Sequence, residues 1–250
     1  MSEQRGRVRV EPAHKRVRAF VDGVPIVDTT SPLLVWEIPY YPAYYVPAAD
    51  VRTDLLVPSG RSEHSPSRGE AQYFTVKTDG REVPDAAWQY PDSPIEELRD
   101  HVRFEWKAMD AWFEEDEEVF IHPRSPHSRV DVLHSSRHVE VHVDGVKIAE
   151  TTRPMLLFET GLPVRYYFPQ TDVRMDLLSP TDTETGCPYK GFAHYWTVDT
   201  GTDTHEDLAW SYRAPFHESL KVAGLVSFYN ERVDIVVDGE AQERPRTPFS

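Results

Sequence analysis

The sequence predicts an all-β protein made of two homologous domains, each a mainly antiparallel, barrel-like or coiled sheet with one short helix. Three observations predict this class. The chain repeats itself, apolar and polar residues alternate over short runs that end in turn residues, and prolines are frequent. The 250 residues include 21 prolines, and 12% of them are aromatic. Short strands joined by stiff turns are typical of this composition.

The repeat becomes visible when the chain is slid against itself by 122 positions without a gap. This shift superimposes Val21-Asp22-Gly23-Val24 on Val143-Asp144-Gly145-Val146, and Asp50-Val51-Arg52 on Asp172-Val173-Arg174. Self-similarity over such a length indicates a duplicated domain. Each half is long enough to bury its own core. We therefore expect a first domain at residues 1–120 and a second at residues 121–250, with an acidic linker over residues 114–126.

The clearest predicted element is a β-hairpin in each copy. Residues 139–143 alternate between apolar and polar, continue into Asp144-Gly145, and resume as an apolar run at 146–149. An Asp-Gly pair between alternating runs is a strong hairpin signal. Residues 17–26 repeat the pattern around Asp22-Gly23. The run 232–239 predicts a closing strand in the second copy, and its counterpart at 110–117 has degenerated into Ala-Trp-Phe and acidic residues.

The remaining elements are expected to be short, because prolines interrupt the chain at close intervals. One helix per copy is predicted. The first begins at Ser93-Pro94-Ile95-Glu96, which has the pattern of a capping box, and the second spans about 216–223 and ends at Gly224. We expect further strands in pairs, at residues 33–37 and 155–159, 44–46 and 166–168, 51–56 and 173–178, and 73–76 and 195–198.

Net charge, apolar content and cysteine count limit the molecules that the protein is expected to bind. The formal net charge of −15 argues against surfaces for nucleic acids or anionic membranes, since both need clustered Lys and Arg. No apolar run approaches the length of a membrane span, and residues 1–9 are charged without an apolar segment behind them. The single cysteine excludes an internal disulfide and fits a reducing compartment. We expect a cytoplasmic protein with a small-molecule ligand, and no nucleic-acid or membrane partner.

Polar residues recur at equivalent positions of both copies. If residues 172–176 are extended, Asp172, Arg174 and Asp176 share one face of the strand. This row is either a structural ladder or an arginine held by two carboxylates to receive an anionic group of a ligand. Glu159 ends an apolar run, where a carboxylate either is desolvated for acid or base work or emerges into water. The recurring pairs are Glu37 and Glu159, Tyr45 and Tyr167, Asp50 and Asp172, Arg52 and Arg174, and Asp54 and Asp176.

The copies differ most at Cys187, which faces Ser65 of the first copy. Gly186 and Pro188 flank it, so we expect it in a turn. Lys190 lies three residues on and would lower the pKa of the thiol, favouring the thiolate. The alternative is an inert thiol that acts as a small apolar core residue.

The remaining motifs do not indicate a particular reaction. Trp210, Tyr195 and Trp196 lie in strand patterns, where they either pack in a core or stack on a ligand. No metal site is predicted, because His194 is the only imidazole near Cys187 and has no partner at ligand spacing. The sequence contains no phosphate-binding glycine loop, no Gly-x-Ser-x-Gly elbow and no His-Glu-x-x-His helix. We therefore expect no cofactor.

The order of motifs resembles the domain of unknown function 427, a largely bacterial family that also carries a nucleotidyltransferase-like label. The motifs are Val-Asp-Gly, Leu-Leu-x-x-Glu, Tyr-Tyr-x-Pro, Asp-Val-Arg-x-Asp-Leu-Leu, Cys-Pro-Tyr-Lys-Gly and Tyr-Trp-x-Val. The resemblance covers nearly all of both halves and implies a compact, mostly-β domain per repeat. The first half departs from it at Ser65, Ser67 and Arg68. The second half matches at Glu159, Tyr166, Tyr167, Pro169, Asp172, Arg174, Asp176, Cys187, Tyr189, Lys190, Gly191, Tyr195 and Trp196.

Two functional hypotheses follow. In the first, the second repeat is a small-molecule enzyme with an aromatic-lined pocket, in which Cys187 is a nucleophile or redox thiol and Glu159 an acid or base. Lys190 and Arg174 are its electropositive partners, and Tyr167 is a donor. In the second, the protein is a non-catalytic module that binds a small ligand or a protein through duplicated aromatic and Asp-Arg-Asp surfaces. The predicted substrate-binding residues are Arg174, Asp172, Tyr189, Tyr195, Trp196 and Trp210, and the first-repeat equivalents of the site are Glu37, Tyr45, Asp50 and Arg52.

Overall fold

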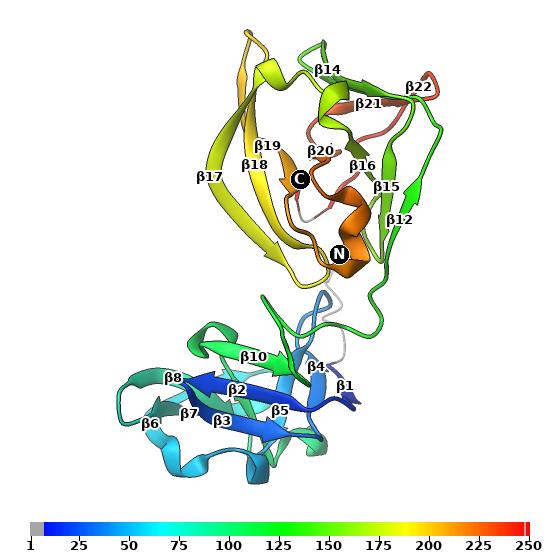
Figure 1. Ribbon diagram of the computed structural model, residues 1–250. Helices are drawn as coiled ribbons and strands as arrows, with labels where there is room; N and C mark the ends of the chain where they lie inside the picture. Colours follow the sequence, from blue (N-terminus) through cyan, green and yellow to red (C-terminus); the bar gives the residue numbers. More distant parts are fainter. Residues whose placement is uncertain (1–7, 248) are drawn as a thin grey trace. The chain divides into compact units, whose positions relative to one another are not determined.

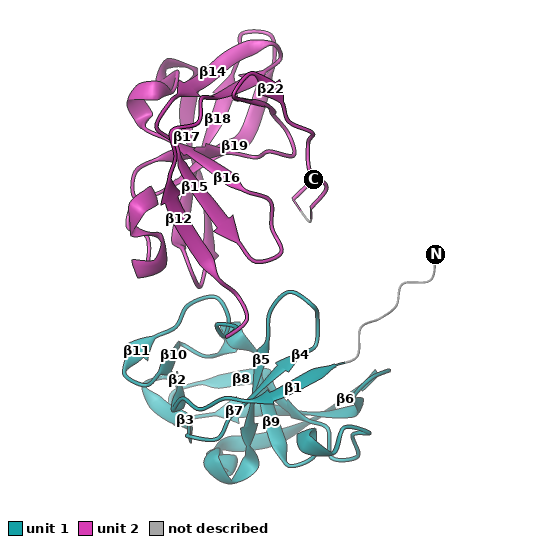
Figure 2. Ribbon diagram, turned by 90° about the vertical axis from the view of Figure 1, so that its right-hand side faces the viewer, with its two compact units in different colours: residues 1–125 teal, residues 126–250 magenta. Residues whose placement is uncertain are grey.

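The computed structural model describes residues 8–247 and 249–250 (Figure 1). Of the charged run at residues 1–9, residues 1–7 lie outside the described residues. The chain divides into two compact units, residues 1–125 and 126–250 (Figure 2). None of the helical segments in the described part of the chain has the length and hydropathy that a membrane span requires.

Each unit contains a seven-stranded and a four-stranded sheet, and the named strands pair antiparallel. The large sheet of the first unit has the order β1 (Arg9–Pro12), β4 (Leu33–Trp36), β5 (Ala43–Pro47), β9 (His101–Phe104), β8 (Glu82–Gln89), β7 (Gly69–Lys77), β6 (Leu56–Ser65). Its small sheet has the order β11 (Glu117–Glu118), β10 (Ala111–Glu114), β2 (Val17–Val21), β3 (Val24–Thr29).

The second unit repeats this topology. Its large sheet has the order β12 (Val130–His134), β15 (Met155–Glu159), β16 (Arg165–Phe168), β20 (Val226–Phe228), β19 (Thr204–Tyr212), β18 (Gly191–Asp199), β17 (Leu178–Cys187). Its small sheet has the order β14 (Val146–Thr151), β13 (Val139–Val143), β21 (Asp234–Val237), β22 (Glu240–Ala241). The predicted all-β, mainly antiparallel class with two homologous halves is confirmed, and no described sheet closes into a barrel.

The predicted hairpins are present in both units. Asp144 and Gly145 have φ angles of 51° and 77° between β13 and β14, and Asp22 and Gly23 have 54° and 70° between β2 and β3. Positive φ at both central residues is the requirement of a type I′ turn, which Asp-Gly meets at little cost. The same logic gives Asp238 and Gly239 positive φ between β21 and β22.

All described helices are 3-10 turns. The two predicted helices are the short elements η3 (Glu96–Leu98) and η7 (His217–Val222), and Gly224 follows η7 with a φ of 70°. Ahead of η3, the hydroxyl of Ser93 accepts a hydrogen bond of 3.1 Å from the N–H of Ile95. The other turns were not predicted; they are η1 (Ala48–Asp50), η2 (Thr53–Leu55), η4 (Trp106–Ala108), η5 (Gln170–Asp172) and η6 (Met175–Leu177).

Three sequence predictions are wrong in detail. Residues 51–56 and 173–178 are not strands: each segment contributes one isolated bridge, at Val51 and Val173, and then a 3-10 turn. Strands β6 and β17 are ten residues each, longer than the proline spacing suggested. The acidic linker is partly sheet, because Glu114 ends β10. Glu114 is buried and accepts hydrogen bonds from Tyr44 and Lys15.

The two faces of each large sheet have different roles. One face packs against the small sheet and forms the main core, which in the second unit includes Phe168 and Phe228. The opposite face, here called the aromatic face, carries Tyr167, Tyr195 and Trp210 in the second unit. In the first unit the aromatic face carries Tyr45, Tyr73 and Trp88. Successive side chains of a strand point to opposite faces of the sheet. Tyr166 and Phe168 therefore point to the core, and Tyr167 between them points to the aromatic face.

Candidate functional site

The predicted catalytic residues meet on the aromatic face of the second unit. Glu159 is the last residue of β15, Tyr167 lies in β16, and Cys187 is the last residue of β17. Lys190 follows in the turn between β17 and β18, where its N–H donates to the carbonyl of Cys187 at 3.3 Å. Strands β15 and β16 thus supply one group each, and the hairpin of β17 and β18 supplies two.

The ammonium of Lys190 donates to the carboxylate of Glu159, and these side chains are 13% and 11% exposed. Three strands lie between β15 and β18 in the sheet order. In a flat sheet the four inter-strand steps would separate them by about 19 Å, beyond the reach of two side chains. The sheet must therefore coil strongly, and Figure 1 shows β17 and β18 on one side of this unit and β12 and β15 on the other. Coiling brings the pair together.

Of the two states predicted for the Cys187 thiol, the direction of its pKa favours the un-ionised one. Burial raises its pKa, and the opposing effect of the Lys190 ammonium is smaller; Glu159 raises the pKa further. The resting side chain is therefore a neutral thiol. Burial also acts to lower the pKa of Lys190, but Cys187, Glu159 and Tyr167 together raise it above the ordinary value. Lys190 therefore stays protonated and paired with Glu159.

Aromatic residues adjoin this cluster. The indole of Trp210 donates to the hydroxyl of Tyr167 at 3.2 Å, and burial raises the pKa of Tyr167 to about 12 although Lys190 acts against it. The hydroxyl of Tyr195 lies 2.7 Å from that of Thr185 and 3.3 Å from that of Tyr229. The site thus combines a largely buried ion pair, a neutral thiol and several phenols.

A second buried ion pair was not predicted. Arg165 of β16 donates two hydrogen bonds to Glu231, at 2.7 and 2.8 Å, and their side chains are 7% and 0% exposed. Its guanidinium also lies 5.6 Å from the ring of Trp210. Thr247, close to the end of the chain, donates to Glu231 at 2.6 Å. The available signal was Arg165 itself, a charge inside an aromatic strand with Ala43 at its position in the first copy.

The predicted Asp-Arg-Asp row does not form. Arg174 has a ψ of 71°, which breaks the extended alternation, and it pairs with Asp176 alone at 2.8 and 2.6 Å on the surface. Asp172 instead accepts from Thr151 at 2.7 Å and lies 3.3 Å from Arg153. The hydrogen bond from Thr151 is the main cause of its lowered pKa.

The first unit has the same surface arrangement. Asp50 accepts from Thr29 at 2.6 Å, and Arg52 donates to Asp54 at 2.8 and 2.7 Å. Both copies therefore satisfy these side chains with partners in the same unit.

Of two further predicted substrate-binding residues, Trp196 lies apart from the cluster's polar groups and Tyr189 adjoins Cys187. Trp196 is partly buried against the main core, on the face of β18 opposite Tyr195. Tyr189 is buried in the turn between β17 and β18, beside Lys190 in sequence. Tyr212 was not predicted, although it lies on the aromatic face. Burial raises its pKa, and Tyr167 and Cys187 add to the effect.

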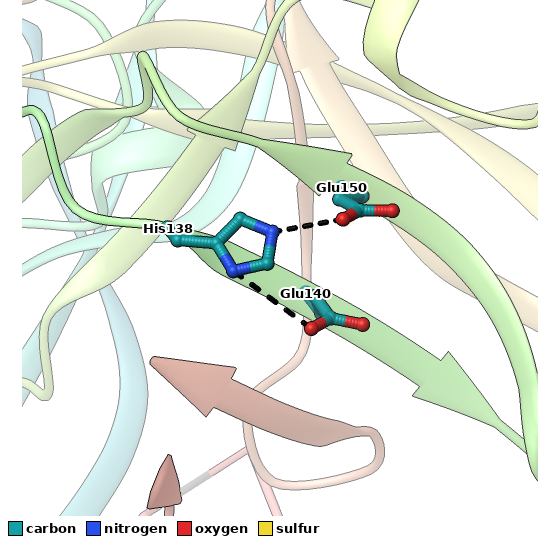
Figure 3. Close-up of side chains that lie close together, drawn as sticks. All are labelled: His138, Glu140 and Glu150. Atoms are coloured by element: carbon teal, nitrogen blue, oxygen red, sulfur yellow. Dashed lines mark hydrogen bonds and ion pairs between the residues drawn. The ribbon is translucent and has the colours of Figure 1, made fainter. Parts of the chain in front are cut away.

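One group on the small sheet of the second unit has the composition of a metal site. A ring nitrogen of His138 lies 2.8 Å from Glu150 and the other 3.9 Å from Glu140 (Figure 3). Their ligand atoms lie within 4.8 Å of one another. Lys147 contacts both carboxylates, at 3.4 Å for Glu140. A metal ion would have to displace this ammonium, so we assign the group to a surface charge network. The alternating His-x-Glu-x-His pattern up to His142 was the available sequence signal.

Fold and site together define a tandem all-β protein whose units each carry an ionic and aromatic cluster on one face of a coiled, seven-stranded sheet. The family model described as a domain of unknown function (DUF427) matches residues 9–115 and again 131–239. The chain belongs to this family, and it contains two copies of the domain. The comparison with curated proteins found no match.

Proposed function

We propose that the second unit is a small-molecule enzyme whose reactive centre is formed by Cys187, Lys190, Glu159 and Tyr167. One observation carries this proposal: four ionisable groups, from β15, β16 and the hairpin of β17 and β18, come together on the aromatic face, outside the main core. Clusters of buried ionisable groups with shifted pKa values are typical of sites for proton transfer and nucleophilic chemistry.

The surroundings of the thiol suggest how it is used. Cys187 is neutral at rest, so a nucleophilic step must begin with loss of its proton. In the proposal Glu159 accepts that proton, and the Lys190 ammonium stabilises the thiolate. The thiolate then adds to an electrophilic carbonyl carbon, where the new S–C bond replaces the C=O π bond and the oxygen takes the charge. Arg174 and Asp172 have no part in this step, because both are satisfied on the surface.

The test is covalent labelling of the intact chain by small electrophilic carbonyl compounds, followed by mass spectrometry. We expect adducts at Cys187 whose rate saturates with probe concentration, and no adduct in Cys187→Ser. Glu159→Gln should slow the saturated rate while leaving the half-saturation concentration nearly unchanged. Labelling that rises linearly with probe concentration and ignores Glu159→Gln would contradict a built reactive site.

The chain supplies a matched control in its first unit. A Ser65→Cys, Cys187→Ser variant moves the thiol to the equivalent position, beside Arg68 instead of a lysine. If position alone made the thiol reactive, this variant would label as Cys187 does. The enzyme proposal expects it to label slowly and without saturation.

The raised pKa of Cys187 favours a second candidate, a non-catalytic module that binds a small ligand on the aromatic face. The first unit retains Glu37, Tyr45 and a basic residue at the position of Lys190 without any thiol, which suits binding better than catalysis. Thermal-shift screening of Cys187→Ser against a metabolite library separates the two. Ligands that stabilise it as strongly as the wild type, with no turnover by the wild type, would favour the module.

A further inference from the structure

The aromatic face of the first unit carries a different charge pattern from that of the second. Arg68 occupies the position of Lys190. Arg103 is an additional cation, and it pairs with Tyr45 across β5 and β9. In the second unit the equivalent tyrosine, Tyr167, pairs with Ser227, so Ser227 is the counterpart of Arg103. The second unit therefore has a serine where the first has a partly buried arginine.

The cations of the first unit are incompletely neutralised. Glu37 lies 3.7 Å from both Arg68 and Arg103, which is longer than a hydrogen bond, and its close contact is the hydroxyl of Tyr45 at 2.6 Å. The other nearby carboxylate, Glu105, is half exposed and 4.0 Å from Arg103. Each buried cation of the second unit, by contrast, has a carboxylate of its own in direct contact.

Buried polar atoms without a partner gather at the same place. Within the described residues, Trp88 Nε1, His101 Nδ1 and Arg103 Nε are buried and make no hydrogen bond. Trp88 is 9% exposed and pairs with Arg103 across β8 and β9, and His101 shares the strand face of Arg103. In the second unit the equivalent indole, Trp210, donates to Tyr167. Buried donors are normally satisfied, so these atoms indicate a partner from outside the chain.

We propose that the first unit binds a small oxyanion at Arg68, Arg103 and Trp88. Guanidinium groups and an indole N–H are donors only, and a guanidinium fork matches a carboxylate or a phosphate. The guanidinium of Arg103 lies 4.4 Å from the ring centre of Trp88, which fixes its orientation. Arg68 and Arg103 remain 17% and 15% exposed, so solvent reaches the cluster at these side chains. No residue of the second unit takes part, and the inference is independent of the proposed enzyme site.

The test uses the indole N–H signals of the full-length ¹⁵N-labelled chain in NMR titrations. Sodium phosphate and sodium benzoate are the probes, and sodium chloride at matched ionic strength is the control. We expect the Trp88 signal, assigned with Trp88→Phe, to shift saturably with at least one probe. Trp210 should stay in place, because its indole is already hydrogen-bonded. A response to phosphate alone identifies a phosphate site, and a response to benzoate alone identifies an organic carboxylate site.

Two variants examine the role of charge. Arg103→Met keeps much of the side-chain volume and should weaken binding about tenfold or more, whereas Arg103→Lys should weaken it less. If Arg103→Met disturbs the amide spectrum of the first unit, Arg68→Met takes its place. The proposal is overturned if neither anion moves the Trp88 signal of the folded wild type, if chloride moves it equally, or if a folded Arg103→Met or Arg68→Met variant binds as tightly as the wild type.

Discussion

The two units place ionic and aromatic residues on the same face of the same sheet, yet they balance charge differently. In the second unit Lys190 and Arg165 each contact a carboxylate of their own. In the first unit Arg68 and Arg103 share Glu37 at a longer distance. The comparison shows that after duplication the scaffold stayed the same while the chemistry of this face changed.

The arginine beside the central tryptophan illustrates this most clearly. Arg103 reaches Trp88 from β9, at 4.4 Å, whereas Arg165 reaches Trp210 from β16, at 5.6 Å. The first unit has Ala43 at the position of Arg165, and the second unit has Ser227 at the position of Arg103. A cation next to the indole is therefore common to both units, although its position in the sequence is not.

The largest expected effect is a loss of stability in the second unit when the ion pair of Arg165 and Glu231 is broken. Glu231→Gln leaves a buried guanidinium without its counter-charge and should destabilise the second unit by about 3–5 kcal/mol. Glu105→Gln is the matched change in the first unit and should have little effect, because Glu105 is half exposed and 4.0 Å from Arg103. Urea unfolding followed by NMR signals of each unit measures both. Equal effects would contradict the difference in charge balance.

The same pair predicts a pH dependence. Burial acts to raise the pKa of Glu231, but hydrogen bonds from Arg165 and Thr247 lower it below the ordinary value. A carboxyl whose pKa is lower in the folded state contributes its stability above the unfolded pKa, and loses it as pH falls through the folded value. The destabilisation by Glu231→Gln should therefore shrink as the solution is acidified through that range. A penalty that is constant down to strongly acidic pH would show that the charge of Glu231 is not its cause.

A smaller difference is expected at the lysine and arginine that face each other in the two copies. Lys190→Met removes the direct partner of the buried Glu159 and should cost about 2–3 kcal/mol. Arg68→Met should cost about 1 kcal/mol, because Arg103 and Tyr45 remain beside Glu37. Thermal and urea unfolding of the two variants give the comparison, and a larger loss for Arg68→Met would reverse it.

The reactivity of the thiol gives a third comparison. Since burial and Glu159 raise the pKa of Cys187, its alkylation by iodoacetamide should be slower at pH 7 than that of an unperturbed cysteine, and should rise only in more alkaline solution. Lys190→Met removes the charge that opposes this shift and should slow the reaction further. Mass-spectrometric rates over a pH series measure this, and an acidic inflection would show a lowered pKa instead.

The smallest effect is expected where the units are most alike. Arg52 and Arg174 each pair with an aspartate two residues on, and all four side chains are largely exposed. Their replacement by alanine should leave the melting temperature nearly unchanged in both units, and equally so at low and high salt. A marked loss in only one unit would reveal a role for Asp-Arg-Asp that the geometry does not show.

Sequence patterns predicted the elements that depend on neighbouring residues. Alternation in residues 139–143 and the Asp-Gly pair fix a strand and a turn locally, and the hairpins follow. The patterns did not predict the backbone of polar segments whose side chains form hydrogen bonds within a tight turn. At Arg174 the backbone leaves the extended region, because short hydrogen bonds within a turn replace pairing with a neighbouring strand.

The sequence predicted the members of the candidate site but not their partners. Glu159, Tyr167, Cys187 and Lys190 could be named from residue types and from the difference between copies. That Lys190 meets Glu159 rather than a neighbour in sequence depends on the coiling of a seven-stranded sheet. The partnership of Arg165 with Glu231 likewise joins residues that sequence spacing does not relate.

By itself, the sequence determined the duplication, the all-β class, the hairpin turns and the family, because each rests on local patterning or on similarity along the chain. The tertiary structure alone decided which charges are paired and whether the thiol is ionised. Both depend on burial and on distances across a coiled sheet, and the pKa of Cys187 follows the balance between burial and the nearby lysine. That balance arises only when distant strands come together.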